Sequence, residues 1–459
     1  MRGLLLLAGL LLLAVPAAAE AKPFVLGTGQ NGGIAIDDDG TVYVGWQINV
    51  YRPGDAVQFC ILPRRTTRCA SQVTIPFPGQ GFNRARVSVL LPAPNVVDVV
   101  EPRTNGTGAY AYLSRSTDGG HRFGPAVQIS GEEFGEAVQG PLGRVALAAG
   151  PTTTRAGLFN PDGSSRRFKG STLGPYLEGV FTDIAVSGAE VLVAGSDAFK
   201  THAFRLPAGG DPNTPAAWQQ IDPAPNGREP AVAGIPGGFA AMLEPSGPGG
   251  NLFAQRLEGA AWSPPVAIGP AVNNSGFTLV SNAKGRLTAM IIYSAYHFLY
   301  TTSTDGGVLW SSLVDTANFK KYPSTLEVAT NASGAGAAVT DASLDDKRVR
   351  VTRFTPRTAP VIRRTIRGVR VQVRSTCSDD GDLSMVVEAA RGNRRVSPST
   401  VLRRASFPST RAARRGFRSK FRARYTLRRR HARIPVRVIP RRGKARTLRL
   451  RVRRCRATQ

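Results

Sequence analysis

The chain consists of short apolar runs separated by glycine, proline, asparagine and aspartate. Apolar runs of roughly four to eight residues between turn residues are typical of β-strands. Three such runs, at 86–91, 96–100 and 109–115, precede Phe123, and a fourth follows it. The composition, with 50 glycines and 33 prolines but no collagen-like period, also favours a chain of many turns. We therefore expect an all-β protein.

Large aromatic residues recur along this strand pattern at intervals of 45, 50, 44 and 48 residues, at Phe123, Phe168, Trp218, Trp262 and Trp310. A period of roughly 20–50 residues with four short strands per unit is typical of the blades of a β-propeller. Seven units fit between residues 24 and 356, and six blades with one extra sheet are the alternative. Strand 23–26 would complete the last blade and close the ring. The innermost strands are expected near Ile34, Val87, Val145, Ile184, Ala231, Phe277 and Leu326.

Two units carry a sharper motif at the turn between their third and fourth strands. These are STDGGHRF at 116–123 and STDGGVLW at 303–310. Both fit S-x-D-x-G-x-x-(F/W), so residues 22–356 resemble the Asp-box (bacterial neuraminidase repeat) propellers, a superfamily that includes sialidases. The resemblance implies a structural role for the motif, on the face opposite the functional one. The residues concerned are Ser116, Asp118, Gly120, Phe123, Ser303, Asp305, Gly307 and Trp310.

The first 21 residues have the pattern of a secretory signal peptide. Arg2 precedes an apolar run at 4–15, and Ala19-Glu20-Ala21 gives a cleavage site. No later stretch is long and apolar enough to span a membrane, so we expect secretion, with association to the cell wall as an option. Four cysteines in an exported chain indicate disulfides, with three formal pairings. Proximity favours Cys60–Cys69, which leaves Cys377–Cys455.

The net charge of +29 is concentrated at one end of the chain. From residue 356 to 459 there are 32 Lys and Arg against 4 Asp and Glu. Strand-like runs occur at 369–373, 383–388, 423–427, 434–439 and 447–452. Around the last two runs, at 433–439 and 446–453, apolar residues alternate with arginines, as in a half-buried sheet. We expect residues 357–459 to form an Arg-rich β-sandwich similar to immunoglobulin-like modules. Such a basic module should bind polyanions, with cell-envelope polymers or glycans favoured over genomic nucleic acid.

Candidate functional residues lie at the upper face of the predicted propeller, where innermost strands begin and second strands end. The weak catalytic candidates are Glu244, Tyr293 and Asp183. The candidate ligand-binding residues are Arg84, Arg86, Glu101, Arg103, Arg228, Glu229, Tyr296 and His297. Aromatic rings beside carboxylates suit a carbohydrate, whose apolar face stacks while its hydroxyls form hydrogen bonds.

The pattern favours binding over catalysis. Sialidases clamp a carboxylate with three arginines and use a Tyr/Glu pair and an Asp, but the Arg-Ile-Pro motif of their first blade is missing near the N-terminus. The only copy, at 433–435, falls in the basic tail. We therefore expect a secreted, non-catalytic, monomeric propeller that binds a carbohydrate or surface ligand, with an exo-acting sialidase-type hydrolase as the alternative. The four histidines show no metal-ligand spacing, and we expect neither a metal nor a cofactor.

Overall fold

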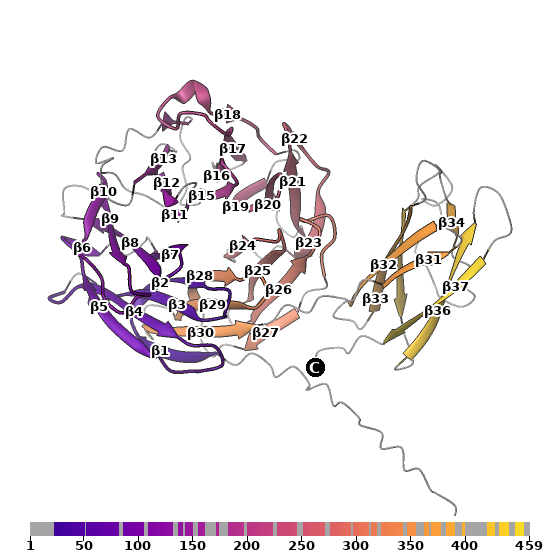
Figure 1. Cartoon of the computed structure of the whole chain (residues 1–459), viewed down its shortest axis with the longest axis horizontal. Helices are drawn as coiled ribbons and strands as arrows, with labels where there is room; N and C mark the ends of the chain where they lie inside the picture. The colour runs from indigo at the N-terminus through magenta and orange to yellow at the C-terminus, as the bar shows by residue number, and fades with distance from the viewer. Residues whose placement is uncertain are drawn as a thin grey trace, which may run out of the picture.

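The computed structural model shows a seven-bladed β-propeller, with the blades arranged around a central axis (Figure 1). The described residues of the propeller are 23–50, 52–81, 86–104, 109–131, 136–140, 143–149, 155–160, 171–173, 182–196, 200–223, 227–245, 251–270, 276–294, 297–311, 314–318, 323–342 and 347–354. In the C-terminal region, the backbone is described over 362–366, 369–377, 382–390, 397–399, 420–426, 431–439 and 446–453. The seven-bladed count is confirmed over the six-bladed alternative.

Each blade is an antiparallel sheet of four or five strands. Blade 1 contains β2 (Gln30–Ile36), β3 (Val42–Ile48), β4 (Ala56–Leu62) and β5 (Ser71–Pro76), and blade 2 contains β6 (Gln80–Gly81), β7 (Ser88–Ala93), β8 (Val96–Thr104), β9 (Ala109–Ser116) and β10 (Val127–Ser130). Blade 3 contains β11 (Glu136–Gln139), β12 (Val145–Ala149), β13 (Arg155–Phe159) and β14 (Ser171–Thr172). Blade 4 contains β15 (Thr182–Ser187), β16 (Glu190–Ser196), β17 (Thr201–Leu206) and β18 (Gln219–Gln220). A short 3-10 helix, η2 (Pro215–Ala217), precedes β18.

The remaining blades complete the ring. Blade 5 contains β19 (Gly227–Ile235), β20 (Gly238–Pro245), β21 (Asn251–Glu258), β22 (Ala261–Trp262) and β23 (Val266–Pro270). Blade 6 contains β24 (Phe277–Ser281), β25 (Leu287–Ser294), β26 (His297–Ser303) and β27 (Val314–Asn318). Blade 7 contains β28 (Pro323–Thr330), β29 (Gly336–Ala342) and β30 (Arg348–Phe354), together with β1 (Phe24–Thr28). Strand β1 pairs antiparallel with β30, from Phe24 opposite Val351 to Thr28 opposite Arg348. The predicted closure of the last blade by the N-terminal strand is thus confirmed.

The innermost strands contact one another around the axis, in the order β2, β7, β11, β15, β19, β24, β28 and back to β2. Six of the seven positions predicted for the innermost strands lie in the observed strand or within one residue of it. The prediction for blade 3 was wrong, because Val145 lies in the second strand, β12, and the innermost strand is β11. The second strand of each blade is covered on both faces by neighbouring blades, so it is the most apolar strand of its blade. The innermost strand faces the axis, so β11 (EAVQ) is short and polar.

Seven hydrophobic clusters form the core of the described propeller, one at each interface between blades. The recurrent aromatics contribute to them. Trp218 and Trp310 are buried, and the ring of Phe123 packs edge-on against Phe59 of the preceding blade, with centroids 4.9 Å apart. Trp262 donates its indole N–H to the Ile221 carbonyl at 2.8 Å. Phe168 lies outside the described residues.

Both motif turns contain the same hydrogen-bonded arrangement. The Ser116 hydroxyl donates to Asp118 Oδ1 at 2.8 Å and accepts the Gly120 N–H, while Asp118 accepts the N–H of Arg122 at 2.9 Å. In the second turn, the Ser303 hydroxyl donates to Asp305 Oδ1 and accepts the Gly307 N–H. Asp305 Oδ1 also accepts the N–H of Leu309 at 2.9 Å. The bonds from Arg122 and Ser116 hold the pKa of the Asp118 carboxyl below its usual value. Gly120 has a φ of 95°, which glycine adopts without strain.

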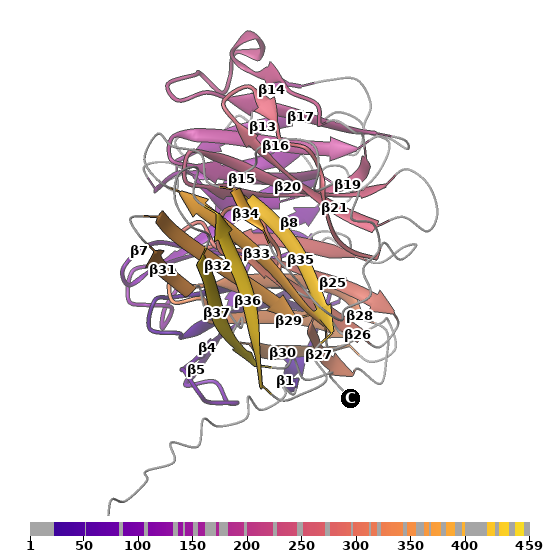
Figure 2. The same cartoon turned by 90° about the vertical axis from the view of Figure 1, so that its right-hand side faces the viewer.

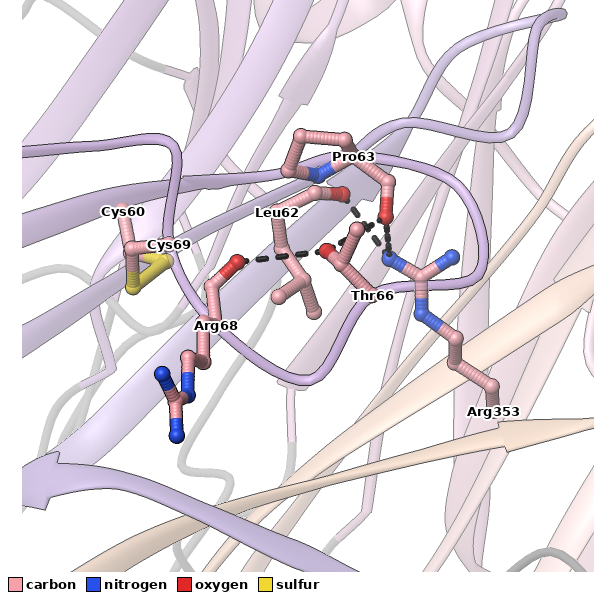
Figure 3. Close-up of a disulfide and its surroundings, with 7 residues drawn as sticks. All are labelled: Cys60, Leu62, Pro63, Thr66, Arg68, Cys69 and Arg353. Carbon is pink, nitrogen blue, oxygen red and sulfur yellow. Dashed lines mark hydrogen bonds between the residues drawn. A yellow bond between two sulfur atoms is a disulfide. The ribbon is translucent and has the colours of Figure 1, made fainter.

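A disulfide replaces that arrangement in blade 1. Cys60 in β4 is bonded to Cys69, just before β5, so the bridge joins the third strand to the fourth, as predicted (Figure 3). The enclosed loop is also held by the last blade. Arg353 of β30 donates from Nη2 to the carbonyls of Leu62 and Pro63, at 2.8 and 2.7 Å (Figure 3). The predicted Cys377–Cys455 bridge involves Cys455, which lies outside the described residues.

Replacing both Cys60 and Cys69 by serine is expected to lower the free energy of unfolding by about 2–3 kcal/mol, because the bridge no longer restricts the unfolded chain. Chemical denaturation measures this difference, and hydrogen exchange should show faster exchange in β4 and β5 than in blades 3 to 6. Reductant should reproduce the effect in the original chain and leave the double variant unchanged. Equal stability with and without the bridge would contradict the prediction.

Beyond the propeller, the described C-terminal strands form two antiparallel sheets. Their strands are β31 (Ile362–Ile366), β32 (Val369–Cys377), β33 (Asp382–Ala390) and β35 (Lys420–Thr426) in one sheet and β34 (Ser397–Ser399), β36 (His431–Ile439) and β37 (Arg446–Arg453) in the other. Four of the five strand-like runs predicted here lie within one of these strands, and the run at 423–427 extends one residue beyond β35. Whether the sheets form an immunoglobulin-like sandwich stays a prediction.

Candidate functional site

Four charged side chains from different blades meet at the axis, and we call them the axial cluster. Arg86 precedes β7 in blade 2, Glu136 begins β11 in blade 3, Asp183 lies in β15 of blade 4, and Glu327 lies in β28 of blade 7. Arg86 forms an ion pair with Glu327, and its charge also acts on Glu136 and Asp183. Blades 2 and 7 lie on either side of blade 1, so this contact joins two blades that are not neighbours in the ring.

The Arg86–Glu327 pair is enclosed but still reached by water. Arg86 keeps 45 % of its side-chain surface accessible and Glu327 keeps 21 %. Arg86 Nη1 also lies 3.4 Å from the carbonyl oxygen of Leu326, the neighbour of its partner. The guanidinium is thus anchored on one side by β28, with accessible surface remaining for a ligand.

Glu136 and Asp183 form a hydrogen-bonded carboxyl pair beside this ion pair. Burial raises the pKa of Glu136 well above its usual value, and the negative charge of Asp183 raises it further. Burial also raises the pKa of Asp183, but bonds to its oxygens oppose that change. These include the Val232 N–H at 2.6 Å and the Ile184 N–H at 2.7 Å. Because Asp183 accepts two backbone N–H groups, we place the shared proton on Glu136 and the charge on Asp183.

The separation of the two carboxyl groups bears on the chemistry. Glycosidases that use two carboxyls hold them roughly 5–9.5 Å apart to leave room for the sugar or a water. Glu136 and Asp183 hydrogen-bond each other directly, which leaves no such room. The axial cluster therefore presents hydrogen-bond donors and acceptors, with one positive charge against two negative ones, rather than the geometry of a paired acid and nucleophile.

A second, fully buried group of polar side chains connects blades 7, 1 and 2. Asp341 Oδ2 accepts the Asn31 N–H at 2.7 Å, and Asn31 Nδ2 donates to Gln47 Oε1 at 2.7 Å. Gln47 Nε2 in turn donates to Glu101 Oε1 at 2.8 Å. Asn31 has a φ of 54°, within a β-bulge of β2 that turns its side chain along this path. Hydrogen bonds thus link three blades just below the upper face.

Arg103 ends this group, and its surroundings give it a structural role. Its side chain has no accessible surface, and Nη1 lies 2.7 Å from Asp55 Oδ1. The other donors reach backbone carbonyls, with Nε bonded to Pro78 at 3.1 Å and Nη2 bonded to Phe77 and Gly79. The guanidinium holds the segment between blades 1 and 2 against β8, so it is not presented to a ligand at the surface.

Glu101 is the most perturbed member of this group. Burial raises the pKa of its carboxyl to about 8, although Arg103 and the bond from Gln47 partly oppose the change. Its Oε2 has no hydrogen-bond partner among the described residues. At neutral pH the group is therefore mostly protonated in the folded protein, whereas an unfolded glutamate is ionised.

This difference predicts a pH dependence of stability. The folded state binds a proton that the unfolded state releases near pH 4.5, so the free energy of unfolding should fall as pH rises from about 4.5 to about 8. In Glu101→Gln the amide stays neutral, and the variant should become more stable than the original chain by on the order of 3 kcal/mol at pH 9. Urea denaturation between pH 5 and 9 measures this, with Glu258→Gln, on an exposed side chain, as control. A constant difference across that range would contradict the assignment.

The other sequence-predicted residues are distributed as follows. Glu244 is buried near the end of β20, with its backbone opposite Arg228. Glu229 has a φ of 51° in a bulge of β19, and its N–H donates to Ser196 Oγ at 3.1 Å. Tyr293 and His297 lie in β25 and β26. Their side chains and that of Arg228, together with Arg84 and Tyr296, lie outside the described residues.

Of the predicted residues, the structure brings Arg86 and Asp183 together, while Glu101 and Arg103 belong to the buried group. Sequence analysis missed Glu136 and Glu327. Glu136 was missed because the innermost strand of blade 3 was placed one strand too late. Glu327 could have been found as a charged residue inside the otherwise uncharged strand PSTLEVAT. Among the described residues, no cluster of three or more His, Cys, Asp or Glu is arranged to hold a metal ion.

Comparisons with known proteins find only distant structural similarities. No family model and no curated protein matches the sequence. Among solved structures, the Hadza microbial sialidase Hz136 matches over 72 % of this chain and 66 % of its own, with 12 % identity and a TM-score of 0.42. YCF48 bound to D1 peptide matches over 74 % and 98 % of the two chains, with 12 % identity and a TM-score of 0.46. An alpha-L-arabinanase from Penicillium chrysogenum matches over 72 % and 97 %, with 11 % identity and a TM-score of 0.43. Similarities at this level do not distinguish a binding protein from a hydrolase.

Proposed function

We propose that this protein is a secreted, non-catalytic propeller that binds a neutral, hydroxyl-rich carbohydrate at the axial cluster. The observation that carries the proposal is the meeting of the Arg86–Glu327 ion pair with Glu136 and with Asp183, whose carboxylate accepts the N–H groups of Val232 and Ile184. This arrangement offers alternating donors and acceptors to hydroxyl groups. Its excess of negative charge disfavours the carboxylate of a sialic acid, and the contact between the two carboxyls disfavours a double-displacement hydrolase.

Three further features belong to this proposal. The two motif turns act as Asp-boxes that brace the lower face, and the serine and aspartate side chains of each turn hold that turn together. The first 21 residues act as the export signal. The basic C-terminal region holds the propeller to an anionic surface. No helix in the described ranges is long and apolar enough to cross a membrane, and retention at a surface is assigned to that basic region.

The binding proposal is tested with labelled protein on a panel of neutral and acidic glycans, followed by calorimetry on the best ligand. Asp183→Asn and Glu136→Gln should each weaken binding at least about tenfold, equivalent to about 1.4 kcal/mol. Asp305→Asn, on the lower face, is the matched control and should bind as the original chain does. Selective binding of sialosides, or no loss in either axial variant, would overturn the proposal.

Catalysis is tested separately with fluorogenic sialosides and other exoglycosides at mildly acidic to neutral pH. We expect no turnover above background. Turnover that is abolished by Glu244→Gln, Tyr293→Phe or Asp183→Asn would instead establish the hydrolase.

A further inference from the structure

The strand register in the C-terminal region places five of the six arginines of β36 and β37 on one face. In β36 and β37, Arg433 lies opposite Arg451, Pro435 opposite Arg449, and Arg437 opposite Thr447. Residues that are directly opposite share a face, as do alternate residues along a strand. One face of this two-stranded ribbon (Figure 2) therefore contains five arginines, which we call the arginine face: Arg433, Arg437, Arg449, Arg451 and Arg453.

The opposite face of the same ribbon is mostly apolar, and its one basic residue is Arg446, opposite Val438. Its other opposed pairs are Ala432 with Val452, Ile434 with Leu450, and Val436 with Leu448. In a strand pair with one apolar and one charged face, the apolar face is the one expected to cover a core and the charged face the one expected to meet solvent. The arginine face is thus the side on which a ligand would be found.

No acidic residue is present in β34, β36 or β37 to neutralise this face. Like charges directly opposite each other destabilise a sheet, so the Arg433–Arg451 pair carries a cost that a bound anion would relieve. The other sheet provides a contrast. The face that carries Arg370, Arg374, Arg422 and Arg424 also carries two acids, Asp382 and Glu388.

We propose that the arginine face of β36 and β37 binds an extended anionic polysaccharide. Alternate residues along each strand are roughly 6.6–6.8 Å apart, so the arginines form two parallel rows that an extended polymer can follow. Guanidinium groups pair in bidentate fashion with sulfate, phosphate and carboxylate groups. The strands contain no Phe, Tyr or Trp on which nucleobases could stack, which favours a polysaccharide over a single-stranded nucleic acid. This inference rests on the surface-retention part of the proposed function and is independent of the axial cluster.

The test uses the full chain without residues 1–21, with heparin, alginate and single-stranded DNA as probes. The face variant carries glutamine at Arg433, Arg437, Arg449 and Arg451. The control variant carries glutamine at Arg370, Arg374, Arg422 and Arg424, so both lose the same charge. We expect the original chain to bind both polysaccharides more tightly than DNA. The face variant should bind heparin at least tenfold more weakly, with a slope of log affinity against log salt that is shallower by about 3. The control variant should change affinity less than threefold.

A second variant with lysine at the four positions of the arginine face keeps the charge and should retain most of the binding, which separates loss of charge from loss of folding. Circular dichroism and thermal unfolding check that each variant is folded. Equal losses in the face and control variants, tighter binding to DNA than to either polysaccharide, or no binding by the original chain would each overturn the proposal. Loss of glycan binding at the axial cluster would leave the heparin measurements unchanged, so failure of the two proposals can be distinguished.

Discussion

Replacing Arg103 by methionine is expected to lower the free energy of unfolding by about 3–5 kcal/mol, the usual consequence of removing one partner from a buried ion pair. The guanidinium is fully buried, and its partner Asp55 has only 7 % of its side chain exposed. Methionine fills a similar volume but donates no hydrogen bond. The Asp55 carboxylate would lose its cation, and the carbonyls of Phe77, Pro78 and Gly79 would lose their donors.

Urea denaturation measures this effect, and Lys200→Met is the matched control. Lys200 lies 3.8 Å from Asp222, and 44 % of its side chain is exposed. An exposed pair of this kind contributes at most about 1 kcal/mol. A loss in Arg103→Met no greater than in Lys200→Met would show that Arg103 does not hold blades 1 and 2 together. The double variant with Asp55→Asn should recover part of the loss, because it removes the isolated charge.

Deleting residues 22–28, which include β1, is expected to destabilise the propeller by roughly 5 kcal/mol or more. The estimate combines the lost burial of Phe24 and Leu26, at about 1.5–3 kcal/mol each, with the lost bonds between β1 and β30, at about 1 kcal/mol each. Both side chains pack against the cluster that joins blades 1 and 7. Without β1, strand β30 becomes an open edge that can pair with another chain.

Differential scanning calorimetry and gel filtration measure the two consequences, a lower unfolding temperature and association into larger species. The control is a chain without residues 1–21 only, which should behave as the folded protein does. Leu26→Asp provides a milder perturbation if the deleted chain does not fold, and it should raise hydrogen exchange in β30 selectively. A monomeric deletion variant of unchanged stability would contradict the role of β1 in closing the ring.

The ring architecture was predictable because it depends on local, repeated signals. Phe123, Trp218, Trp262 and Trp310 mark one position in blades 2, 4, 5 and 6, where a large ring fills the space against the preceding sheet. Turn glycines and a strand length of a few residues then determine the number of strands per unit. The short separation of Cys60 and Cys69 made their pairing the simplest one, and it is present.

The axial cluster was less predictable because it depends on contacts between blades. Arg86 and Glu327 are 241 residues apart in the chain, and nothing local indicates that they meet. Arg103 shows the converse. Its position at the upper end of β8 predicted a surface ligand contact, but the segment 77–79 folds over its guanidinium and buries it. Sequence patterns thus singled out Arg86, Asp183 and Arg103 as candidates, whereas their partners required the three-dimensional structure.

The pairing of β1 with β30 also has a consequence for the order in which the chain folds. Phe24 is among the first propeller residues to be synthesised, and its partner Val351 follows 327 residues later. At roughly 5–20 residues per second, β1 waits tens of seconds for that partner. Cys60 and Cys69 become available together early in synthesis, so blade 1 can be cross-linked long before blade 7 exists. Pairing of β1 with β30, which joins the two ends of the propeller, is therefore the final event in propeller assembly. Interrupted synthesis would leave an open arc of blades with an unpaired N-terminal segment.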